Sequence, residues 1–279
     1  MSVFASALVT AVLVGALCGI IGTIVVLRQR AFFTVALTHA TFPGGVLAAI
    51  IGVHLALGAL VMGMLLVALM VVIGTIHRQG KEVAAGIVLS FGYALGTFLH
   101  ALNPQLQTKI DSYLTGTILG MSADSILLIA IMLGITLVAV LLWWQPLLYS
   151  TFDQRGFVAS GARGWQIETV TLVLIVGTVV VTMPAIGSIL AIAMIAAPAA
   201  AAKLLVRNVV WLMPTAIVLG VAAAAFGLYA SRWWSISAGG SIALSATAIY
   251  LFALLGQGMR TSSRRLRTQI APRSIAVNK

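Results

Sequence analysis

The chain has 279 residues, of which 61% are hydrophobic and only 8% are charged, and its mean hydropathy is +1.14. A water-soluble globule of this length could not bury so much apolar surface, so the composition excludes a soluble enzyme or binding module. The formal net charge of +11 could indicate a nucleic-acid partner, but the placement of the charges along the chain argues against one. We therefore expect an integral membrane protein in a lipid bilayer.

Seven windows free of Asp, Glu, Lys and Arg predict the membrane-spanning segments. A helix needs roughly 20 apolar residues to cross about 30 Å of hydrocarbon, and two of the windows are long enough for two crossings. The apolar runs are continuous, whereas the strands of a β-barrel would alternate apolar and polar residues. The predicted fold class is all-α and polytopic, with about eight to nine transmembrane helices. The nine-span interpretation places them at residues 4–27, 31–52, 55–76, 83–102, 125–145, 165–183, 185–206, 209–229 and 239–258.

The basic residues predict the orientation. If the N-terminus is outside, nine crossings place fourteen of the sixteen Lys and Arg residues on the cytoplasmic side, leaving only Lys109 and Arg232 on the other side. This distribution follows the positive-inside rule, and it puts the C-terminus in the cytoplasm. The positive charge therefore indicates topology and contact with anionic lipid headgroups, and no nucleic-acid partner is expected.

The first span contains Cys18, the only cysteine, so the chain can form neither an internal disulfide nor a thiolate metal cluster. Residues 1–27 lack a basic leading region and a small-residue cleavage site, which predicts a retained helix. Glycines four residues apart, such as Gly15 with Gly19 and Gly92 with Gly96, have the spacing that allows close helix packing.

The second span contains the strongest candidate for chemistry, His39. A neutral imidazole at membrane depth can bind zinc or manganese, and Thr38 and Thr41 could add oxygen contacts. The alternative is a histidine that is hydrogen-bonded to a neighbouring helix. Pro43, followed by two glycines, is expected to break or kink this span and free carbonyl groups to face a cavity.

Other ionisable residues are expected near the ends of spans. His54 and His100 lie near outer ends, where solvation at the interface is their expected role. The five acidic residues also fall at span ends or in loops, which argues against a proton-relay transporter; they are Glu82, Asp111, Asp124, Asp153 and Glu168.

Three polar segments complete the predicted organisation. Residues 111–121 are too short and polar to cross alone, so we expect a short re-entrant or outer-face helix. Residues 149–164 are predicted to form a short cytoplasmic helix with Asp153 at its N-terminus, able to transmit force from a soluble ATPase, although a solvated loop is the alternative. Residues 1–259 are thus expected to form a single transmembrane permease domain, and 260–279 a basic cytoplasmic tail.

The chain contains no Gly-x4-Gly-Lys-Ser/Thr phosphate-binding loop. If the protein pumps, ATP must therefore be used by a separate subunit. This chain itself is expected to bind no cofactor and to carry no enzymatic activity.

Six segments, in order, resemble the motifs of the permease subunits of the bacterial zinc/manganese ABC-importer family. They are LRQRAFFTVALTHATFPGG (27–45), KEVAAGIVLSFGYALG (81–96), SYLTGTIL (112–119), FDQRGFVASG (152–161), IGSILAIAMIAAPAAAA (186–202) and AGGSIALSA (238–246). Each segment alone is weak evidence in so apolar a chain. Their order and spacing make the resemblance specific.

This resemblance implies a homodimer, or close pair, of permeases in the bacterial cytoplasmic (inner) membrane. A cytoplasmic ATP-binding subunit would dock on the segment that contains Phe152, Asp153 and Gly161. An extracytoplasmic metal-binding protein would deliver a divalent metal ion from outside. An ATP-independent secondary carrier is the less favoured alternative, because neither inverted repeats nor buried acidic residues are evident.

The chain departs from the family at Val35, where the family has an aspartate four residues before its histidine. Val35 cannot bind metal, but His39, with Thr38 or Thr34, could still form a softer site across a dimer. Losing a hard oxygen ligand should weaken manganese binding more than zinc binding, which favours zinc. The same loss leaves open a permease for a metal chelate, such as a siderophore or haem.

Overall fold

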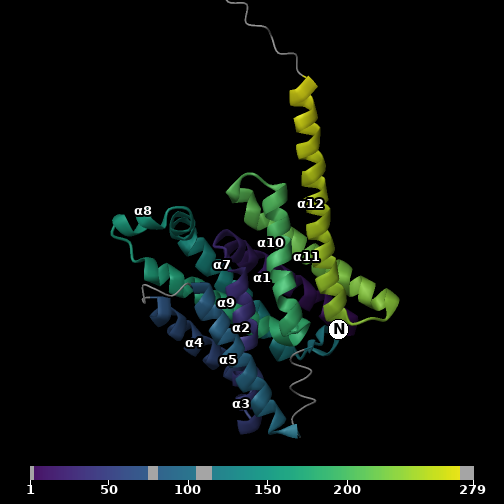
Figure 1. Cartoon of the computed structure of the whole chain (residues 1–279). Coiled ribbons are helices and arrows are strands. Elements are labelled where there is room, and N and C mark those ends of the chain that lie inside the picture. The colour runs from purple at the N-terminus through teal and green to yellow at the C-terminus, as the bar shows by residue number, and fades with distance from the viewer. Residues whose placement is uncertain (1–2, 75–80, 105–114, 271–279) are drawn as a thin grey trace, which may run out of the picture.

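A computed structural model describes residues 3–74, 81–104 and 115–270, which fold into a bundle of helices (Figure 1). In chain order the elements are α1 (Val3–Leu27), α2 (Ala31–Ala40), α3 (Phe42–Ile51), α4 (Leu55–Gly74), α5 (Lys81–Ala101), η2 (Ile118–Gly120), α7 (Ala123–Phe152), α8 (Gln154–Ala159), α9 (Gly164–Ile186), α10 (Ser188–Leu205), α11 (Val209–Trp234) and α12 (Ala238–Ile270).

The predicted all-α, multi-pass class is confirmed. Six helical stretches are long and apolar enough to span a membrane, and three shorter apolar helices accompany them within the described ranges. The six are residues 3–27, 31–51, 123–152, 164–186, 209–234 and 238–258, and the three are 55–70, 85–101 and 190–205. All nine predicted spans thus have a helical counterpart. The last helix, however, continues past the predicted end at residue 258 as far as Ile270.

The first helix lies in the middle of the core. Most of the C-terminal half of α1 is buried, and the helix packs against α7, α10 and α11. A methyl group at Gly15 would lie 2.6 Å from the carbonyl oxygen of Gly220, and one at Gly19 would lie 2.7 Å from that of Ala216. Backbone therefore meets backbone between α1 and α11. Small residues permit this approach, as predicted for the Gly15 and Gly19 pair.

A second group of helices, α2 to α5, packs together beside this core. A methyl group at Gly92 of α5 would lie 2.6 Å from the Cα atom of Ala40, and Gly96 makes room for the ring of Phe42. The short side chains on α5 thus let α2 and α3 approach its backbone closely. This packing fixes the position of α2, the helix that carries His39.

The segment before α7 packs on the junction between α9 and α10. Its described residues form the short helix η2, in which Ile118 is buried. The backbone N–H of Thr117 donates to the carbonyl oxygen of Pro184 at 2.9 Å, and Gly116 adopts a left-handed φ of 73° against Gly187. A short helix was predicted within residues 111–121, and residues 111–114 lie outside the described ranges.

Candidate transport and coupling site

The predicted second span is interrupted at Thr41, which separates α2 from α3. The Thr41 hydroxyl donates to the carbonyl oxygen of Leu37 at 2.9 Å, so it bonds back onto the preceding turn. Pro43 lies in the first turn of α3, where its missing N–H removes no helical hydrogen bond. The break predicted from Pro43 and the glycines after it is therefore present, two residues earlier than the proline.

His39 lies in the last turn of α2, half-buried, with its ring against Tyr93 of α5. The two ring centroids are 5.6 Å apart and the ring planes meet at 83°, an edge-to-face arrangement. Phe42 extends this row, since its ring centroid lies 6.5 Å from that of Tyr93. Val35, one turn before His39, is also half-buried, so it lies on the same face of the helix as the imidazole.

The three threonines proposed to assist His39 face the protein interior, and the bonding of Thr41 is described above. Thr34 and Thr38 are buried, and their hydroxyls donate to the carbonyl oxygens of Arg30 at 3.1 Å and Val35 at 2.7 Å. Their role as metal ligands stays a prediction. Among the residues that the structure describes, no group of three His, Cys, Asp or Glu side chains could hold a metal ion. His39 alone in one chain would leave a metal site incomplete.

The short helix predicted within residues 149–164 is present as α8, directly after α7. The carboxylate of Asp153 accepts a hydrogen bond from the backbone N–H of Gly156 at 2.8 Å and so caps the N-terminus of this helix. Phe157 is buried against Tyr149, with ring centroids 5.6 Å apart at 89°. Gly161 ends the segment with a left-handed φ of 82°.

Phe152, the residue next to the cap, is 64% exposed. An exposed aromatic ring beside a short, anchored helix can contact another protein. The coupling role of Phe152, Asp153 and Gly161 stays a prediction.

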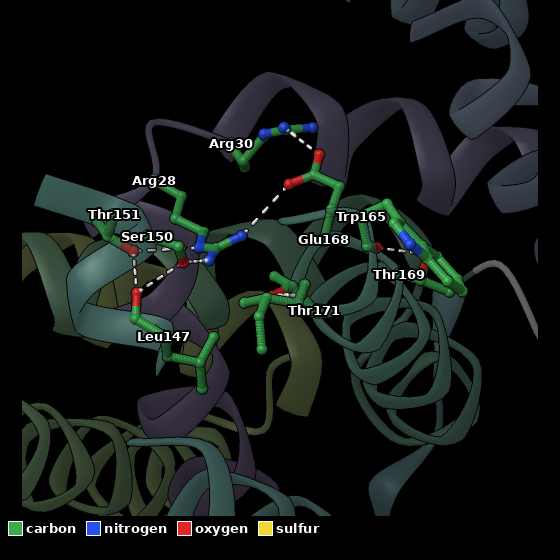
Figure 2. Close-up of polar contacts among 10 residues, drawn as sticks. Arg28, Arg30, Leu147, Ser150, Thr151, Trp165, Glu168, Thr169 and Thr171 are labelled. Atoms are coloured by element: carbon green, nitrogen blue, oxygen red, sulfur yellow. Dashed lines mark hydrogen bonds and ion pairs between the residues drawn. The ribbon is translucent and has the colours of Figure 1, made fainter. Parts of the chain in front are cut away.

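A cluster of charges joins the connection between α1 and α2 to α7 and α9 (Figure 2). The guanidinium of Arg28 donates to Glu168 at 3.3 Å, to Ser150 at 2.5 Å and to Thr151 at 3.2 Å. Arg30 donates to the other carboxylate oxygen of Glu168. Burial lowers the pKa of Arg28 because desolvation penalises its charged form, while Glu168 opposes this shift. One carboxylate therefore bridges two arginines.

A polar cavity of about 110 Å³ adjoins this cluster. It opens beside α8 and is lined by the three charged residues, by two hydroxyl groups and by the buried aromatic ring of α8. The lining residues are Arg28, Arg30, Ser150, Thr151, Gln154, Phe157, Gly164 and Glu168. Such a lining can hold water next to the ion pairs.

Two residues of this site were missed in the sequence. The sequence places Glu168 only at the end of a span. The available signal was that Arg28 and Arg30 are expected on the same side of the membrane as Glu168. Tyr93 carried no signal, because an aromatic residue in an apolar span resembles its neighbours. The structure brings Tyr93 to His39, and Glu168 to the base of α2.

A bundle of nine apolar helical stretches in the described ranges, with a short capped helix between two of them, defines the chain as a polytopic membrane protein. The model of the ABC 3 transport family matches residues 1–257, and the chain belongs to that family. It is an ABC permease and not itself an enzyme.

Individual relatives agree with this assignment. The chain is 31% identical over 250 residues to the manganese transport system membrane protein MntC of Halalkalibacterium halodurans, covering 88% of this chain and 85% of that protein. It is 29% identical over 239 residues to the chelated iron transport system membrane protein YfeC of Yersinia pestis, covering 86% and 81%. Among solved structures it is similar to PsaBC from Streptococcus pneumoniae in complex with Fab, with a TM-score of 0.82, 27% identity and 91% coverage of both chains.

Proposed function

We propose that this permease carries a divalent metal ion across the bacterial cytoplasmic membrane as part of an ABC importer. His39, half-buried in a membrane span and next to Tyr93, is the observation that carries the proposal. The names of two relatives, for manganese and for chelated iron, support the same class of cargo. The N-terminus lies outside and the C-terminus in the cytoplasm, as the distribution of Lys and Arg indicates.

The metal site is proposed to form between two copies of the chain. A single His39 supplies one ligand, and first-row metals bound by proteins usually have three or more. Val35 occupies the position one turn before His39 and offers no side-chain oxygen. With two imidazoles and no carboxylate, the site favours zinc over manganese, because hard oxygen ligands suit manganese better. Thr34 and Thr38 would contribute hydroxyl oxygens only after α2 rotates, since both are buried.

Energy for transport would come from a separate cytoplasmic ATP-binding subunit that docks on α8. The capped helix, the exposed Phe152 and the polar cavity beside α8 support this position. An extracytoplasmic metal-binding protein would supply the cargo at the opposite side of the membrane.

The proposal is tested with the full complex in lipid vesicles, by comparing uptake of zinc, manganese and iron by wild type and by His39→Ala. We expect wild type to favour zinc and His39→Ala to lose most uptake while still stimulating the ATPase. His54→Ala is the matched control, because His54 is exposed in the connection between α3 and α4. Unchanged uptake in His39→Ala would rule out the role given to His39.

A metal chelate is the second candidate cargo. The absence of a charged ligand at Val35 and the similarity to a chelated iron system membrane protein both favour it. Uptake of a siderophore-bound or haem-bound metal that persists in His39→Ala, with no uptake of the free ion, would select this candidate.

A further inference from the structure

The charge cluster lies at the base of the helix that carries His39. Arg30 immediately precedes α2, and His39 is in the last turn of the same ten-residue helix. At 1.5 Å per residue, the two residues are separated by roughly 14 Å along one rod. A displacement of the first turn of α2 should therefore also move the imidazole, because the ten-residue helix is uninterrupted between Arg30 and His39.

The partners of the two arginines come from α7 and α9, the two helices that flank α8. Ser150 and Thr151, which accept from Arg28, belong to the last turn of α7, and Glu168 lies in the second turn of α9. A force that tilts α8 must pass through one of these two helices. Both of them are linked to the same connection between α1 and α2.

Glu168 is the central member of the cluster because its carboxylate pairs with both arginines. The side chains of Arg28, Arg30 and Glu168 are 9%, 17% and 28% exposed. The two guanidinium groups that share Glu168 repel each other, and the attraction of each to the carboxylate offsets this repulsion. Water in the adjoining cavity can solvate the charges when a pair separates, so the contacts can open and reform during a cycle.

We propose that Glu168 is a positioning residue that transmits movement of the coupling segment to α2 and thereby to His39. The proposal rests on the proposed function, which assigns the ATPase to α8 and the metal to His39. Glu168 contacts neither ATP nor metal in this scheme. It acts through Arg28 and Arg30, and its loss uncouples the two sites without removing either.

Direct packing offers the competing path. The Thr41 hydroxyl lies 3.8 Å from the sulfur of Met183, so α2 also contacts α9 near its other end. If packing alone transmits movement, neutralising Glu168 will leave transport coupled.

The test measures metal uptake per ATP hydrolysed in vesicles that contain the permease, its ATPase and its binding protein. The variants are Glu168→Gln, Glu168→Asp and the charge exchange Arg30→Glu with Glu168→Arg. Arg207→Gln is the matched control, because Arg207 is an exposed arginine between α10 and α11, outside the cluster. Co-purification of the ATPase shows that each variant is folded and assembled.

We expect Glu168→Gln to hydrolyse ATP but to lower uptake per ATP by about tenfold. Glu168→Asp and the charge exchange should recover part of this loss, and Arg207→Gln should match wild type. Wild-type coupling in Glu168→Gln would overturn the proposal. If Glu168→Gln fails to assemble, the charge exchange decides: recovered coupling supports the proposal, and an assembled but uncoupled complex overturns it. A wild-type complex that moves no metal would contradict the proposed function instead.

Discussion

The imidazole of His39 meets the ring of Tyr93 edge-on, with centroids 5.6 Å apart, and so connects α2 to α5 at membrane depth. Edge-to-face ring pairs contribute about 0.5–1.5 kcal/mol beyond the area that they bury. The contact limits the orientations that His39 can adopt before it meets a metal ion.

Tyr93→Ala should therefore raise the metal concentration needed for half-maximal uptake by about threefold to tenfold, because His39 loses a contact that orients it. Tyr93→Phe keeps the ring and should resemble wild type. Initial uptake rates over a range of metal concentrations provide the measurement. If Tyr93→Phe raises this metal concentration as much as Tyr93→Ala does, the hydroxyl and not the ring orients His39.

Val35→Asp should shift the metal preference toward manganese. The substitution places a carboxylate one turn before His39, on the half-buried face where the imidazole lies. We expect the ratio of manganese to zinc uptake to rise by about tenfold, because loss of even an outer-shell partner of a metal ligand typically changes metal affinity by about 10- to 100-fold. Val35→Asn is the control, because asparagine has the shape of aspartate without its charge, and it should change the ratio little.

Asp153→Ala should weaken α8 by about 1 kcal/mol through loss of its cap, and should reduce stimulation of the ATPase. Asp153→Asn retains a capping oxygen and should preserve stimulation. Hydrogen exchange at residues 154–159, measured alongside ATP hydrolysis, separates the two effects. Faster exchange without any loss of stimulation would place the docking surface elsewhere.

Gly15→Ala should destabilise the bundle by about 1–3 kcal/mol, because its methyl group would meet the carbonyl oxygen of Gly220 at 2.6 Å. Gly134→Ala is the matched control: a methyl group there meets nothing within 4 Å. Thermal unfolding in the same detergent should show a clear loss for the first variant and none for the second.

The sequence predicted the fold more completely than the site. Charge-free windows are long-range signals, so all nine spans were located, and Asp153 before a short helix gave a local capping signal that α8 confirms. The pairing of Arg28 with Glu168 joins residues 140 positions apart, and one sequence contains no record of which distant charges meet. The inward orientation of Thr34 and Thr38 was likewise hidden, because a helix that is apolar around most of its surface does not reveal which face its neighbours cover.

The contact between Gly15 and Gly220 is made by main-chain atoms, so it contains no side chain that could switch rotamer and let the helices slide. Shifting α1 along α11 by even one residue would push a β-carbon into a carbonyl group. We expect these two helices to move as a single body. The change between outward-facing and inward-facing states would then come from movement of helices α2 to α5 relative to the α1–α11 pair.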